Sequence, residues 1–114
     1  MSTTYWAEGY LDAIDTAGGV FAVQNPQPKE VIMLRCIINV TTASTAACTI
    51  DIGVAADAET SDDSIVAGLD VNSEGITEYS TPIICPFENY FTASMASGAT
   101  EGLEGKYYIE YKIA

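Results

Sequence analysis

Four carboxylates in one short polar segment are the residues with the clearest potential for chemistry. They are Asp57, Glu59, Asp62 and Asp63, in the run D-A-E-T-S-D-D. Hard oxygen ligands at alternate positions of a flexible loop can bind Ca²⁺. The spacing resembles an EF-hand loop, but the glycine and the closing glutamate of that loop are missing at their offsets. The segment therefore predicts either a calcium site or, more simply, a solvated acidic loop.

Other catalytic chemistry has little to build on in this sequence. The chain contains no histidine, which removes the commonest general base and any Ser-His or Cys-His nucleophile. It also lacks the G-x-S-x-G, P-loop and G-x-G-x-x-G motifs. Nothing in the acidic segment separates a pair of carboxylates suited to glycoside hydrolysis from their neighbours. We therefore expect a protein that is not an enzyme and has no cofactor other than possible calcium.

Charge is the strongest signal in the composition. Sixteen acidic residues face four basic ones, so the net charge is −12. No lysine or arginine stands between Arg35 and Lys106, whereas eleven carboxylates do. A surface of this kind repels phosphate groups, whose recognition depends on lysine and arginine. Nucleic acids and anionic membranes are therefore not expected as partners.

Two β-rich runs, 31–40 and 48–54, organise the expected fold around a loop of small residues. Both alternate apolar and polar residues with period 2, which is typical of strands with one buried face. We interpret them as a hairpin at the centre of a sheet. Together with the later strands they predict these buried residues: Ile32, Leu34, Cys36, Ile38, Val40, Ile50, Ile52, Phe91, Ile109 and Tyr111.

The rest of the chain adds further short strands and no helical periodicity. Strands are expected at 10–15, 20–23, 76–79, 87–96 and 106–113, and 83–86 is expected to be a connector or an edge strand. With turn signals between them, they predict a single-domain, all-β antiparallel sandwich or small barrel. Residues 1–8 show no pairing pattern and are expected to form an N-terminal arm, followed by the β-sandwich domain at 9–114.

Three cysteines stand at irregular positions in the chain. Cys36 and Cys48 fall on apolar strand faces, and the odd count with Cys85 favours free, buried thiols. A Cys36–Cys48 bridge is the alternative.

The N-terminal residues lack the basic and apolar regions of a signal peptide, and no apolar run is long enough to span a membrane. We therefore expect synthesis and folding in a cytoplasm.

Aromatic residues at the two ends of the chain are candidates for a contact surface. Tyr5, Trp6 and Tyr10 lie in or beside the expected arm, and Tyr108 lies on the polar face of the last strand. Aromatics left outside a packed core are enriched in interfaces between subunits. The four residues therefore form the predicted interface.

Several short motifs resemble a family of small virion proteins encoded beside the major capsid protein of tailed bacteriophages and prophages. They are Asn25-Pro26, Val40-Thr41-Thr42, T-I-D-I-G-V-A-A-D-A at 49–58, Ser61-Asp62 and G-L-D-V at 68–71, so the resemblance spans residues 19–75. It implies a jelly-roll-like sandwich that sits on the outside of the phage head as a decoration or head-fibre protein, as a homotrimer bound to the major capsid protein. Assembly would take place in the bacterial host cytoplasm.

A carbohydrate- or receptor-binding β-sandwich of a phage or bacterial surface structure is the alternative function. In that case Trp6 and Tyr108 would stack on sugar rings. A β-sandwich alone does not separate the two, because this architecture carries many functions. Neighbouring capsid genes would favour decoration, and neighbouring tail or glycan-processing genes would favour the alternative.

Overall fold

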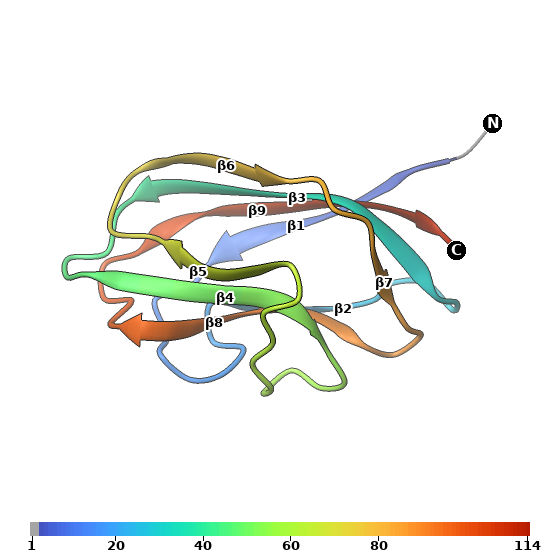
Figure 1. Cartoon of the computed structure of the whole chain (residues 1–114), viewed down its shortest axis with the longest axis horizontal. Helices are drawn as coiled ribbons and strands as arrows, with labels where there is room; N and C mark the ends of the chain where they lie inside the picture. The colour runs from blue at the N-terminus through green and yellow to red at the C-terminus, as the bar shows by residue number, and fades with distance from the viewer. Residues whose placement is uncertain (1–2) are drawn as a thin grey trace.

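A computed structural model describes residues 3–114, and nine β-strands within this range form an elongated sandwich of 43 × 25 × 19 Å (Figure 1). Within this range no helix is long and apolar enough to cross a membrane. The strands are β1 (Tyr5–Leu11), β2 (Phe21–Gln24), β3 (Val31–Thr42), β4 (Cys48–Ala55), β5 (Val66–Asp70), β6 (Gly75–Tyr79), β7 (Ile83–Cys85), β8 (Tyr90–Gly98) and β9 (Glu104–Ile113).

The strands belong to two antiparallel sheets. The large sheet has the order β1-β9-β3-β6, with β7 also paired to β3, and the small sheet has the order β2-β8-β4-β5. Most connections cross from one sheet to the other, as Figure 1 shows. This order, with β1, β9, β3 and β6 facing β2, β8, β4 and β5, is that of a jelly roll. The predicted all-β, antiparallel, jelly-roll-like sandwich is therefore confirmed.

The predicted hairpin between the two central runs is wrong. β3 belongs to the large sheet and β4 to the small sheet, so the two strands face each other across the core. Residues 43–47 carry the chain between the sheets, and the buried Ser44 donates its backbone N–H to the Val71 carbonyl at 3.0 Å. Alternation shows that each run has one apolar face. It does not show whether two such runs pair edge to edge or pack face to face.

A β-bulge changes which residues of β3 are buried. The pairing of β3 with β9 shifts register between Met33 and Arg35. An extra residue in one strand reverses the side-chain alternation beyond it. Met33 is therefore buried, and the predictions for Ile32 and Leu34 are wrong, since both are only half-buried. Beyond the bulge, Cys36, Ile38 and Val40 point into the core as predicted.

The predicted arm at 1–8 is corrected for residues 5–8, which form the first half of β1. Residues 1–2 lie outside the described part of the chain. β1 pairs with β9 without a break from Tyr5–Tyr111 to Leu11–Gly105. Two of its inward-facing residues, Ala7 and Gly9, have small side chains or none, so the apolar alternation is weak in the sequence. The β-sandwich domain therefore includes residues 5–8, which the apolar alternation in the sequence did not assign to a strand.

The core lies between the two sheets and contains the other predicted residues. Ile38 and Ile109 of the large sheet and Ile50, Ile52 and Phe91 of the small sheet are fully buried. Aromatic stacking links the sheets at one end, where the rings of Phe21 and Tyr107 lie 3.9 Å apart and almost parallel. The core therefore fixes how the outer face of each sheet is presented.

Candidate functional site

The acidic segment lies on the outer face of the small sheet. Two outward-facing residues of β8, Thr92 and Ser94, are buried beneath it and beneath the β1–β2 connection. Thr92 donates its hydroxyl to the Thr60 carbonyl at 3.3 Å, and Gly18 donates its N–H to Ser94 Oγ at 2.8 Å. Instead of projecting freely, the segment covers the sheet.

Two of the four predicted calcium ligands are engaged in holding this segment in shape. Asp57 Oδ1 accepts hydrogen bonds from the Glu59 N–H and the Thr60 hydroxyl, at 2.9 and 2.8 Å. Asp62 Oδ1 accepts them from the N–H groups of Ser64 and Val54, at 2.8 and 3.2 Å. Burial raises the pKa of Asp62, but the hydrogen bonds from Ser64 and Val54 outweigh it and lower the pKa.

The described geometry does not assemble a metal centre. Among residues 3–114, no group of three or more carboxylates, thiols or imidazoles could hold a metal ion. Asp57, Glu59, Asp62 and Asp63 therefore share a loop without converging on one point. The calcium site stays a prediction without geometric support.

The three cysteines are free and buried, as the sequence predicted. Burial raises the pKa of Cys36 to about 12 and that of Cys85 to about 11. The pKa of Cys48 is also raised, first by burial and then by the nearby charges of Asp15 and Asp70. Because the thiolate is the reactive form, these residues have neither the exposure nor the ionisation of a nucleophile.

The outer face of the large sheet, which we call the large-sheet face, gathers the other candidate residues. Strand register places Trp6 beside Glu110 and Arg35, Tyr108 between Glu8 and Ile37, and Lys106 between Tyr10 and Asn39. β6 and β7 extend these rows with Ile76, Glu78 and Ile84. Within the described residues, no loop folds over the central strands of this face, whereas the acidic segment covers the small sheet (Figure 1).

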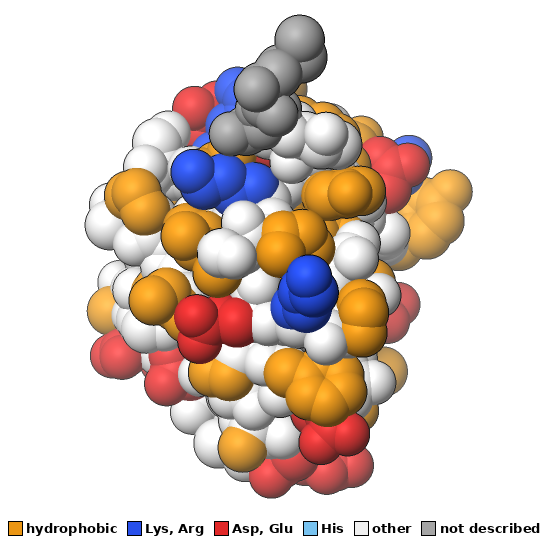
Figure 2. All heavy atoms as spheres, turned by 90° about the vertical axis from the view of Figure 1, so that its right-hand side faces the viewer, with side chains coloured by type: hydrophobic (Ala, Val, Ile, Leu, Met, Phe, Trp, Pro, Cys, Tyr) orange, Lys and Arg blue, Asp and Glu red, His pale blue; other side chains and the backbone are white. Residues whose placement is uncertain are grey.

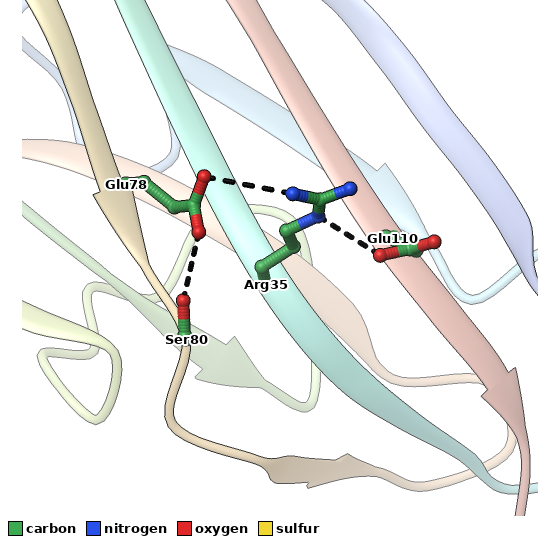
Figure 3. Close-up of polar contacts among 4 residues, drawn as sticks. All are labelled: Arg35, Glu78, Ser80 and Glu110. Carbon is green, nitrogen blue, oxygen red and sulfur yellow. Dashed lines mark hydrogen bonds and ion pairs between the residues drawn. The ribbon is translucent and has the colours of Figure 1, made fainter.

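Arg35 is at the centre of a polar network on this face (Figure 3). Its Nε donates to Glu110 Oε1 at 2.9 Å, and its Nη1 lies 3.6 Å from Glu78 Oε1. Ser80 in turn donates its hydroxyl to Glu78 Oε2 at 2.9 Å. The guanidinium also lies 5.2 Å from the centre of the Trp6 ring. The network joins β1, β9, β3 and β6 and fixes the charged groups of the face.

A second cation organises the aromatic part of the face. The Lys106 ammonium lies 5.3 Å from the centre of the Tyr10 ring and 5.8 Å from that of Tyr108. Cation–π contacts at such distances are attractive and are stronger where water is excluded. Trp6, Tyr10 and Tyr108 are therefore ordered on a single face together with Arg35 and Lys106.

Three of the four predicted interface residues come together in this way. Tyr5 does not, because it points to the opposite side of β1 and stacks on Tyr111 with the ring centres 5.5 Å apart. Sequence reasoning did not find Ile76 or Ile84, which lie on short edge strands at the other margin of the face. In the sequence, each is only an isoleucine in a short strand. Its place on this face becomes clear only when the strand order is known.

Charge separates the large-sheet face from the rest of the molecule. By register it carries three of the four basic residues and four of the sixteen acidic ones: Arg35, Lys106 and Lys112 against Glu8, Glu78, Glu104 and Glu110. The other twelve carboxylates share the remaining surface with a single basic residue, Lys29. In the end view of Figure 2, carboxylates gather along the lower edge, on the side of the small sheet, and basic groups lie among hydrophobic ones above.

The fold is shared with chains of known phage capsids. A chain in the acidic stable capsid structure of Helicobacter pylori bacteriophage KHP30 matches with a TM-score of 0.71 and 13% identity, over 98% of this chain and 89% of that one. The capsid of Ralstonia phage GP4 contains a match with a TM-score of 0.63 and 15% identity, over 100% and 85%. The capsid asymmetric unit of cyanophage Pam1 contains one with a TM-score of 0.59 and 14% identity, over 99% and 86%.

The sequence comparisons give no such matches: no family model fits this chain, and no curated protein matches it. At 13–15% identity the structural matches show a common fold. Since the matches cover 98–100% of this chain and 85–89% of the solved chains, the shared unit is the whole sandwich.

Proposed function

We propose that this protein is a structural component of a tailed-bacteriophage virion, without catalytic activity. It binds the outside of the head as a homotrimer and contacts the major capsid protein. The observation that carries the proposal is the jelly roll that this chain shares, almost end to end, with small chains of three phage capsids. The motifs at residues 19–75, which resemble those of phage decoration proteins, support the same role.

The distribution of charge supports a protein that is bound on one side and solvated on the others. One face is nearly balanced in charge and carries exposed aromatics, whereas the remaining surface is strongly acidic. Excess charge of one sign keeps a surface hydrated and discourages further association. A subunit that had to contact neighbours on every side would not benefit from such a surface.

Binding to heads tests this proposal directly. The purified protein is mixed with heads of the phage or prophage whose genome encodes it, after removal of any resident copies, and the heads are sedimented. We expect the protein to sediment with the heads at a fixed number of copies, and to appear outside the shell by electron cryomicroscopy. Protein that stays in the supernatant while the heads remain intact would contradict the proposal.

Exposed aromatics give the carbohydrate-binding alternative its one specific support. Trp6 and Tyr10 are 44% and 72% exposed, and flat rings on a sheet can stack on sugars. Each ring, however, has a cation close to it, Arg35 at 5.2 Å and Lys106 at 5.3 Å. Glycan binding that is lost in Trp6→Ala, without binding to heads, would favour this alternative.

A further inference from the structure

We propose that the large-sheet face is the contact surface between copies of this chain. Each copy places the β1–β9 half of the face against the β3–β6–β7 half of the next copy. The inference rests on the homotrimer of the proposed function and adds which residues would form its contacts. When three copies turn this face toward a common axis, the β1–β9 half of each copy meets the β3–β6–β7 half of the next. Such a heterologous contact closes into a ring when the rotation between neighbouring copies is threefold.

Exposed hydrophobic residues favour this face over the others. Among residues 3–114, seven large hydrophobic side chains are strongly exposed, and the large-sheet face carries four of them. Trp6 and Tyr10 lie along the β1 margin, whereas Ile76 and Ile84, 72% and 53% exposed, lie along the β6–β7 margin. Single exposed apolar residues are ordinary. Aromatic residues on one margin and isoleucines on the opposite margin give unlike halves that can pack against each other.

Charge favours a second copy as the occupant of this surface. Outside the face, twelve carboxylates are offset by Lys29 alone, so two copies approaching through those surfaces would repel each other. Within the face, Arg35 and the carboxylates of Glu78 and Glu110 already satisfy one another. Two copies that meet over this network therefore leave none of its three charges unpaired, and an unpaired buried charge would be costly.

The free edge of β1 exposes backbone N–H and C=O groups that a neighbouring copy could cover. β1 pairs with β9 along one side, and no other described strand pairs with it. Its sequence, Y-W-A-E-G-Y-L, lacks the proline, lysine or bulge that commonly blocks pairing at an exposed edge. A neighbouring copy that covers the β1 margin would shield these backbone groups as well as Trp6 and Tyr10.

Tryptophan fluorescence tests the inference, because Trp6 is the only tryptophan. The full chain is diluted stepwise, and light scattering, emission maximum and acrylamide quenching are recorded at each concentration. We expect a trimer at high concentration with a blue-shifted, poorly quenched Trp6, and an accessible Trp6 after dissociation. Tyr10→Ala and Ile76→Ala should each weaken association about tenfold or more, since both remove apolar contact. Phe87→Ala is the matched control, because Phe87 is 54% exposed but lies between β7 and β8, off the face.

The possible outcomes separate the inference from the function on which it rests. A trimer in which Trp6 remains freely quenched and the two variants behave like the control would overturn the face assignment and leave the trimer intact. A dimer with a protected Trp6 would support the face and overturn the threefold arrangement. A monomer at every concentration would overturn both the face assignment and the threefold arrangement. The virion role is judged separately by binding to heads.

Discussion

The three cysteine side chains illustrate how burial controls chemistry at the residue scale. Cys36, Cys48 and Cys85 lie inside the sandwich with raised pKa values, so they remain protonated thiols near neutral pH. We expect all three to resist Ellman's reagent in the folded protein at pH 8 and to react at once in denaturant. A thiol that reacts rapidly in the native state, or a disulfide found by non-reducing mass spectrometry, would contradict this.

The same pKa values predict a loss of stability at alkaline pH. In the unfolded chain the thiols ionise near their ordinary value of 9.0, whereas in the folded chain Cys85 and Cys36 ionise only near 11 and 12. The folded state therefore binds more protons between these limits. The stability from buried neutral thiols is complete below about pH 8.5 and falls as the pH rises toward 12. Thermal melts from pH 7 to 11 should show this loss as a falling melting temperature. Cys36→Ala should make the melting temperature fall less steeply with pH.

Asp62 is the acidic residue whose removal should matter most for the loop at 56–65. Asp62→Ala removes the acceptor of the Ser64 and Val54 N–H groups, and we expect a loss of about 1 kcal/mol. Asp63→Ala, at an exposed neighbour, is the control. Because the pKa of Asp62 is lowered, its contribution is present above its ordinary value of 3.8 and is lost as the pH falls through the folded value.

Calcium binding can be decided in the same melts. With no metal centre among the described residues, we expect the melting temperature to be unchanged by added CaCl₂. A rise that is present in the native chain and lost in Asp57→Ala would instead support the calcium site.

At the scale of elements, the sequence predicted strands and their inward residues better than the way they pair. Period-2 alternation placed β3, β4, β8 and β9 correctly, because each has one face in the core. The partner of a strand depends on the path of the whole chain, so β3 and β4 appeared to form a hairpin. Residues 5–9 of β1 were missed because the inward-facing Ala7 and Gly9 are small, whereas Trp6 points outward. The large-sheet face was therefore only partly predictable.

The bulge in β3 gives a test that separates two adjacent residues. Met33→Ala removes a side chain that is 1% exposed and should cost about 2–5 kcal/mol through the cavity it leaves. Leu34→Ala, at a half-buried position beside the register shift, should cost clearly less. Urea unfolding of both variants gives the comparison. Simple alternation predicts the opposite ranking, so a larger loss in Leu34→Ala would show that β3 keeps an unbroken register.

At the scale of the whole molecule, the position of β1 changes how the N-terminus must be studied. Deleting residues 1–8 would remove the first half of β1 and expose the edge of β9, including the backbone of Tyr111 and Ile109. Any loss of binding would then reflect damage to the large sheet. Substitutions of exposed side chains, Trp6 and Tyr10, leave the strand pairing in place and are the better probes.

Salt should strengthen self-association, because each chain carries a net charge of −12 and the proposed contact has little net charge of its own. Raising the ionic strength from 0.01 to 0.15 M shortens the Debye length from about 30 to about 8 Å, which screens repulsion between the acidic surfaces of neighbouring copies. Sedimentation velocity over this range should show the trimer forming at progressively lower protein concentration.

A variant with fewer charges provides the control for this salt effect. Glu59→Gln with Asp63→Asn removes two exposed carboxylates of the 56–65 segment, which lies on the small sheet and away from the proposed contact. We expect this variant to associate more tightly at 0.01 M and to respond less to salt. If ion pairs between copies held the trimer together, added salt would weaken it. Association that falls steadily with salt in both proteins would therefore contradict a charge-balanced, largely apolar contact.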